Sequence, residues 1–175
     1  MKVRLVCVGL MLVALFSSCN REVKPFVGDY SYKISGNVCR ITPKVTNGNE
    51  YDTTYQMVTQ RGQMKVMRDM QRGENHLLVT LNEMNGGVCT LSATVRGDSL
   101  FFEPYTFVLS LPAASDLPAE LPSNLQNLVY EVQATGAGFV NRNMILMKHQ
   151  WSGVKVSNNK ATLKGNDMTF VAERN

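Results

Sequence analysis

Hydrophobic and polar residues alternate with a period of two along most of the chain. In residues 29–35, Tyr30, Tyr32 and Ile34 fall on one side and polar residues fall on the other. Residues 130–135 repeat this alternation. Because successive side chains of a β-strand point to opposite faces, the pattern predicts strands with one buried face. The sequence therefore predicts an all-β domain.

Short groups of glycine, asparagine, aspartate and serine separate the alternating segments and predict tight turns. The predicted turns include Ser35-Gly36-Asn37, Arg61-Gly62, Arg72-Gly73, Asn85-Gly86-Gly87, Arg96-Gly97-Asp98 and Lys164-Gly165-Asn166. About nine or ten separate strands are expected between such turns. The candidate spans are 27–35, 38–46, 53–60, 63–70, 75–84, 87–95, 98–104, 128–136, 139–151, 160–164 and 167–173.

The succession of short hairpins also predicts how the strands associate. Antiparallel strands leave exposed edges unless the sheet closes on itself or stacks on another sheet. Consecutive hairpins favour an antiparallel meander barrel of about eight to ten strands, and a β-sandwich is the alternative. The proline-rich segment 111–127 interrupts the rhythm as a long connection, either a strap over the barrel or a surface crossover. Too few residues follow it for a second core, so residues 26–175 are expected to form one domain.

The first residues of the chain have the pattern of a secretory signal. Lys2 and Arg4 precede an uncharged, mostly apolar run from Leu5 to Phe16, and two serines follow. A basic start, an apolar middle and small residues at the exit define a signal peptide, here residues 1–18. The apolar run is too short for a transmembrane helix, which needs about 20 apolar residues.

The residues at the end of this segment resemble a known processing motif. Phe16-Ser17-Ser18-Cys19 resembles the bacterial lipobox, although phenylalanine stands where leucine is most common. The resemblance implies that Cys19 carries a diacylglyceryl thioether and an N-acyl chain such as palmitate. Two lipid attachments hold a protein firmly on a membrane. Asn20, in place of aspartate, implies sorting to the outer membrane of the cell envelope, with the periplasmic or outward-facing side left open. Residues 19–25 are expected to be a tether.

Removal of the signal changes the composition that matters for function. The full chain has 18 basic and 14 acidic residues. Lys2 and Arg4 leave with the signal, so sixteen basic residues remain against fourteen acidic ones and the net charge falls to +2. No Lys/Arg-rich stretch remains, so nucleic acid is not expected as a partner.

Two cysteines remain once the signal and the lipidated residue are set aside. Cys39 and Cys89 are both expected on inward faces, Cys39 together with Ile41 and Val45. In an oxidising compartment they could form one disulfide. Two buried free thiols, which pack as small apolar residues, fit the pattern equally well.

The start of the domain resembles a known family. Phe26-Val27-Gly28-Asp29-Tyr30 is similar to the opening of lipocalin-like (calycin-type) domains, in which Gly-x-aromatic starts the first strand and tryptophan usually stands where this chain has Tyr30. Together with the lipobox and the final segment Phe170–Asn175, the layout resembles lipocalin-like lipoproteins of Gram-negative gut anaerobes. The resemblance implies a ligand-holding β-barrel, in a group whose members mostly have no assigned activity.

No pattern in the sequence indicates catalysis. The chain has no Gly-x-Ser-x-Gly elbow, no zinc signature and no phosphate-binding glycine loop before a helix. His149 shares a face with Ile145, Met147 and Trp151, which is typical of a core or rim histidine. We therefore expect a protein without enzymatic activity, metal or cofactor, and an enzyme of unrecognised type is the third hypothesis after two kinds of binding.

Two kinds of binding fit these features. Eight methionines follow the signal, and methionine adapts to irregular apolar shapes, so a small apolar or amphipathic ligand is expected unless they only fill the core. The expected ligand-lining residues are Tyr30, Tyr32, Met57, Met64, Met147 and Trp151. The alternative is an accessory lipoprotein that docks a surface protein through an exposed aromatic patch. Its candidate residues are Tyr51, Tyr55, Phe101, Phe102, Tyr105 and Phe107.

Overall fold

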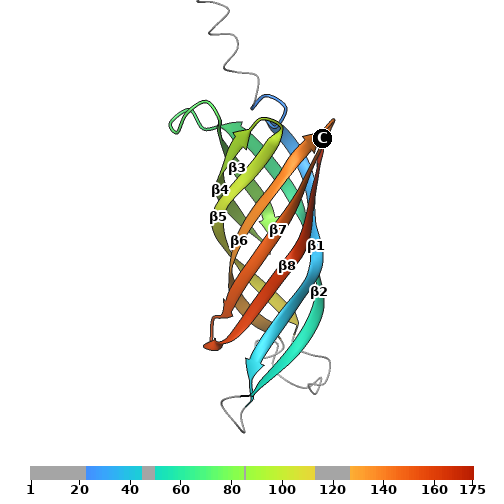
Figure 1. Cartoon of the computed structure of the whole chain (residues 1–175), viewed down its shortest axis with the longest axis vertical. Helices are drawn as coiled ribbons and strands as arrows, with labels where there is room; N and C mark the ends of the chain where they lie inside the picture. Colours follow the sequence, from blue (N-terminus) through green and yellow to red (C-terminus); the bar gives the residue numbers. More distant parts are fainter. Residues whose placement is uncertain (1–22, 45–49, 85, 113–126) are drawn as a thin grey trace, which may run out of the picture.

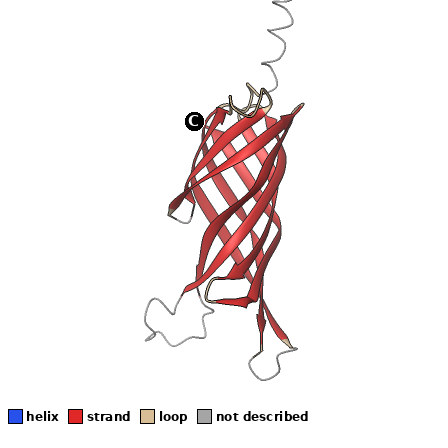
Figure 2. Cartoon of the chain, turned by 90° about the vertical axis from the view of Figure 1, so that its left-hand side faces the viewer, coloured by secondary structure: helices blue, strands red, loops and turns tan. Residues whose placement is uncertain are grey.

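A computed structural model describes residues 23–44, 50–84, 86–112 and 127–175. The predicted signal, Cys19 and most of the proline-rich connection lie outside these ranges. All regular elements within them are strands (Figure 2). The strands are β1 (Gly28–Pro43), β2 (Tyr51–Arg68), β3 (His76–Met84), β4 (Gly87–Arg96), β5 (Ser99–Pro112), β6 (Asn127–Asn141), β7 (Met144–Lys155) and β8 (Asn158–Arg174).

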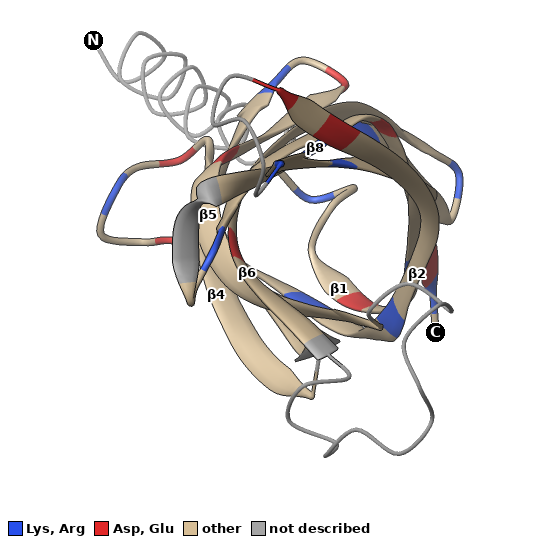
Figure 3. Cartoon of the chain, turned by 90° about the horizontal axis from the view of Figure 1, so that it is seen from below, with Lys and Arg blue, Asp and Glu red and all other residues tan. Residues whose placement is uncertain are grey.

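The eight strands form a closed antiparallel meander barrel. Each strand pairs with the next, and β8 returns to pair with β1 (Figure 1). Seen from below, the strands surround a single axis, with residues of both charge signs distributed around the ring and its loops (Figure 3). The predicted meander barrel is confirmed, and the β-sandwich alternative is not the fold.

Three predicted turns are wrong because the strands are longer than expected. Ser35-Gly36-Asn37, Arg61-Gly62 and Lys164-Gly165-Asn166 lie inside β1, β2 and β8. At the first of them, the register of β1 with β8 shifts between Ser35 and Cys39. A glycine inside a strand commonly marks a bulge or bend, not a reversal of the chain. Short candidate spans therefore merge into strands of 16–18 residues.

The barrel interior is apolar and rich in aromatic rings. Tyr32 stacks on Phe170 with ring centroids 5.6 Å apart, and Phe107 meets Trp151 edge to face at 5.1 Å. All four side chains are at least nine-tenths buried. Burial of a large apolar side chain contributes roughly 1.5–3 kcal/mol, so these rings dominate the stability of the wall around them.

The N-terminal turn closes the upper end of the barrel. Val23 and Phe26 are both buried, and the Tyr30 hydroxyl donates a hydrogen bond to the Phe26 carbonyl at 2.8 Å. Arg174 Nη2 donates to the carbonyl oxygen of Pro25 at 2.6 Å and to the Tyr30 hydroxyl at 2.7 Å. Val23, which lies within the predicted tether 19–25, is therefore packed against the barrel.

The β3–β4 hairpin covers only the upper part of the wall (Figure 1). β2 is in register with β3 only over Met64–Arg68, and β4 with β5 only over Ala93–Arg96. Within the described ranges, the ladders with this hairpin therefore do not extend to residues 51–59 of β2 or to residues 105–112 of β5. We call the part of the wall between these two segments the side interval. Pro104 lies where pairing with β4 stops, and proline has no backbone N–H to donate to a neighbouring strand.

Candidate functional site

A buried histidine lies among the aromatic rings in the middle of the barrel. His149 is fully buried, its Nδ1 lies 3.3 Å from the Tyr105 hydroxyl, and its ring stacks on Phe170 at 5.0 Å. Burial lowers the pKa of His149 to about 4, so the ring is neutral at pH 7. A Cβ added to Gly136 would lie 2.5 Å from its Nε2, so this atom is pressed against the β6 backbone. His149 is thus a packed core residue, as the alternation predicts.

Below this aromatic layer, a buried cation faces the interior. Arg40 lies on the inward face of β1, next to Leu163 of β8, and is 6% exposed. A guanidinium is a permanent cation, and burial of an ion costs several kcal/mol unless it is paired. None of the ion pairs between described residues involves Arg40. Its partner is the Tyr130 hydroxyl, and its Nε has no hydrogen-bond partner.

Two further buried polar atoms near Arg40 lack partners among the described residues. These are Oε1 of Gln56 and Nε1 of Trp151. Gln56 pairs with Val38, two residues before Arg40, and Trp151 lies two residues before Gly153, which pairs with Leu163. We call this region the lower interior. It is formed by Arg40, Gln56, Phe107, Tyr130, Trp151 and Leu163.

The lower interior lies beside the side interval. Tyr105 and Phe107 keep exposed fractions of 6% and 7%, whereas Tyr30 and Phe170 are fully buried. Gln56 and Cys89 are half-buried. The Cys89 thiol lies 3.8 Å from the Thr106 carbonyl oxygen, which β4 no longer pairs, and burial raises the pKa of this thiol. The rings of β5 that border the side interval are therefore slightly more exposed than the rings deeper in the barrel.

The structure places the predicted ligand-lining residues in two groups. Tyr30, Tyr32, Met64, Met147 and Trp151 are buried on the inward face, and whether they line a ligand stays a prediction. Met57 is a correction, because it is 72% exposed on the outer face.

The error at Met57 follows from its surroundings in the sequence. It lies between Gln56 and Val58, whose side chains both face the barrel interior. The side chain of Met57 therefore faces outward. The local sequence there does not alternate clearly enough to reveal which side faces the core.

The two remaining cysteines are free thiols on opposite sides of the wall. Cys89 faces inward, as predicted. Cys39 and Ile41 face outward, which corrects the prediction. β1 continues through the predicted turn at residues 35–37, so the alternation that buries Tyr30, Tyr32 and Ile34 carries on unbroken and turns Val38 and Arg40 inward. Val45 lies outside the described residues.

The buried cation was missed in the sequence for the same reason. Arginine is rarely buried, and a turn predicted at residues 35–37 kept the alternation that begins at Tyr30 from being extended to Arg40.

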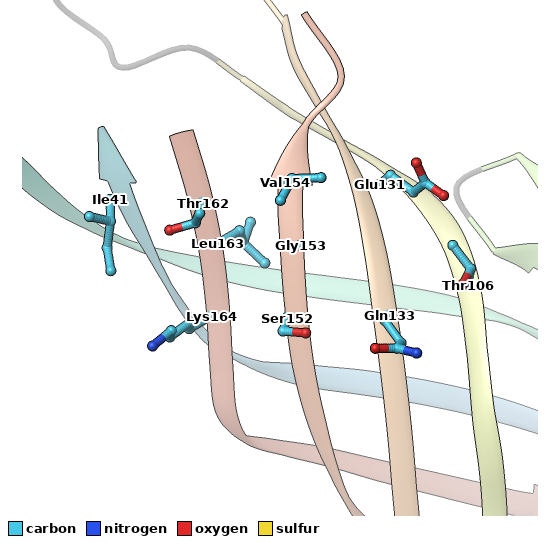
Figure 4. A pocket seen from close by; sticks show the side chains of 10 residues that line it. All are labelled: Ile41, Thr106, Glu131, Gln133, Ser152, Gly153, Val154, Thr162, Leu163 and Lys164. Atoms are coloured by element: carbon cyan, nitrogen blue, oxygen red, sulfur yellow. The ribbon is translucent and has the colours of Figure 1, made fainter. Parts of the chain in front are cut away.

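A groove of about 690 Å³ lies on the outer surface of the barrel, over the lower parts of β1 and β5–β8 (Figure 4). Its outward-facing side chains are mixed, with Lys164 and Glu131 on β8 and β6 and hydroxyl and amide groups between them. Gly153 and Gly165 occupy inward positions of this wall, and neither has a side chain that points into the barrel. Its size suits a small ligand, and its lining combines apolar side chains such as Ile41 and Val154 with polar ones.

No arrangement within the described ranges supports catalysis by metal. No cluster of three or more His, Cys, Asp or Glu residues is present there. The same part of the chain has no helix of the length and apolarity needed to cross a membrane. Comparison with models of known protein families, with curated proteins and with solved structures gives no match. The lipocalin-like resemblance therefore stays a prediction.

Proposed function

We propose that this chain is a lipid-anchored, non-enzymatic binding protein of the cell envelope, held on the outer membrane through Cys19. Its ligand is a small apolar or amphipathic molecule in the lower interior. The observation that carries the proposal is the set of unpartnered buried polar atoms on Arg40, Gln56 and Trp151 in a barrel whose interior is mostly apolar. A buried polar atom without a partner costs about 1–3 kcal/mol, and a bound polar group would remove that cost.

The shape of the barrel suggests the route of entry. The turn Val23–Phe26 fills the upper end, where the chain comes from the proposed anchor (Figure 1). The ligand would then enter through the side interval or the lower end, on the side of the barrel away from the anchored end.

Native mass spectrometry of the protein extracted from its own membranes tests this function. We expect an additional non-covalent mass of a few hundred daltons, lost at high collision energy. Ala161 is buried and lies on the inward side of β8, so Ala161→Leu should lower ligand occupancy by filling space. Thr162→Leu, one residue later and facing the outer groove, is the matched control. A wild-type protein without any bound small molecule would contradict the proposal.

A second candidate function is docking of a surface protein. Tyr51, Tyr55 and Met57 are 58%, 74% and 72% exposed on the part of β2 that borders the side interval. A strand edge without a partner can add a strand from another protein. Of the predicted aromatic patch, Phe101 is also exposed, but Phe102, Tyr105 and Phe107 are buried. A bound protein instead of a small mass in the same spectra would favour this function.

A further inference from the structure

The chemistry around Arg40 narrows the class of ligand, if the proposed function holds. A guanidinium presents five N–H donors in a planar fork and no acceptor. Tyr130 takes up part of this capacity, and the Nε donor of Arg40 is left over. The indole N–H of Trp151 is a second unused donor in the same region. A ligand with acceptor oxygen atoms would satisfy these two buried N–H donors.

The chain's own described carboxylates do not fill this role. The nearest ones along the hairpin are Glu50 and Asp52, toward the lower tip of β1 and β2. Lys44 engages both of them, with N–O distances of 3.1 Å and 3.9 Å. The residues in register with Arg40 are Thr54 and Leu163, which carry no charge. The positive charge of Arg40 therefore remains uncompensated by the described residues around it.

The surroundings of the cation are apolar on the side toward the barrel centre. Phe107 and Trp151 are in edge-to-face contact on the inward face of the barrel, and Leu163 is in register with Arg40 on the neighbouring strand. A free inorganic anion could use the Tyr130 hydroxyl and the Trp151 indole N–H, but it would leave the apolar side chains of this region without a partner. A molecule with a hydrocarbon chain would bury that chain against these rings at roughly 0.8 kcal/mol per CH₂ group on general grounds.

We infer that the ligand is an amphiphile with an acidic head group, whose anionic oxygens bind the guanidinium of Arg40 and the hydroxyl of Tyr130. Its hydrocarbon chain lies against Trp151 and Phe107. A carboxylate or a phosphate monoester satisfies this chemistry, because both accept paired N–H bonds from a guanidinium. This inference rests on the proposed function and adds the charge of the head group to it.

Calorimetric titration of the mature chain with three probes of equal chain length tests the inference. The probes are dodecanoic acid, dodecyl phosphate and 1-dodecanol. We expect at least one of the two acids to bind about 10-fold more tightly than the alcohol, or better, which is the effect of one charge-assisted pair. Arg40→Met should abolish this preference and leave the alcohol affinity unchanged.

Two further variants provide a second test of the site and a control for the loss of a positive charge. Tyr130→Phe preserves the ring and should weaken acid binding about 3-fold to 10-fold, so the inference stays testable if Arg40→Met does not fold. Lys164→Met removes the same charge from the outer groove and should leave the preference intact.

The outcomes separate the inference from the function on which it rests. Equal affinity of the wild type for acids and alcohol would overturn the acidic head group but leave the binding function standing. An acid preference that survives in both Arg40→Met and Tyr130→Phe would overturn the assignment to these residues. Failure of all three probes to bind would contradict the proposed function as well.

Discussion

Replacement of Gly62 by alanine is expected to destabilise the barrel by about 3 kcal/mol, which is at the upper end of the cost of overpacking. A Cβ at this position would lie 2.1 Å from the Asn82 carbonyl oxygen and 2.9 Å from the Tyr32 ring. The Tyr32 hydroxyl donates to the same oxygen at 3.0 Å, so alanine would also break this hydrogen bond. Urea unfolding of wild type and variant measures the loss.

Gly87 provides the control for this substitution. A Cβ there would lie 3.6 Å from the Met84 carbonyl oxygen, an ordinary contact. Gly87→Ala should change the free energy of unfolding by less than about 0.5 kcal/mol. Equal losses at Gly62 and Gly87 would show that the close approach of β2 to Asn82 does not exist in solution.

Acidification is expected to remove about 3 kcal/mol of stability through His149. Its pKa is about 4 in the barrel and 6.5 in the unfolded chain, because the folded state buries the ring. Between these values the unfolded chain binds a proton that the folded one does not, so the free energy of unfolding falls as pH drops from about 6.5 toward 4. Above pH 6.5 the contribution is fully present.

Denaturant unfolding at several pH values measures this dependence. The variant His149→Gln should be less stable at pH 7 but should lose less stability on acidification. Gln150→Asn, at the neighbouring exposed position of β7, is the control and should keep the wild-type dependence. Identical pH profiles for wild type and His149→Gln would mean that the ring is not held in its neutral form.

The fold was largely predictable from local alternation. Segments such as Tyr30–Ile34 and Tyr130–Ala134 indicate strands with one apolar face, and their number and spacing indicate a closed meander. The strand lengths were not predictable in the same way. Gly62 follows Arg61, and this pair predicts a turn. The position requires glycine for another reason, because Tyr32 and the Asn82 carbonyl oxygen, which are far apart in the sequence, occupy the space that a side chain would need. Such a requirement exists only once the strands are paired.

The candidate site was less predictable than the fold. The inward positions of Tyr32 and Trp151 follow from alternation within one strand. Arg40 continues the same alternation as Tyr30 and Tyr32, but only because β1 runs unbroken through the predicted turn at residues 35–37. A sequence pattern without register information cannot reveal whether a glycine ends a strand or lies inside it. The side interval likewise depends on which strands fail to pair.

Fluorescence quenching of Trp151 tests most directly whether the ligand lies inside the barrel. Trp151 is the single tryptophan of the chain and is 2% exposed. We predict that 12-bromododecanoic acid quenches it saturably with one molecule bound per chain, that Ala161→Leu weakens the effect, and that Thr162→Leu leaves it unchanged. Quenching that survives in Ala161→Leu but is lost in Thr162→Leu would place the ligand in the outer groove and contradict a binding site within the barrel.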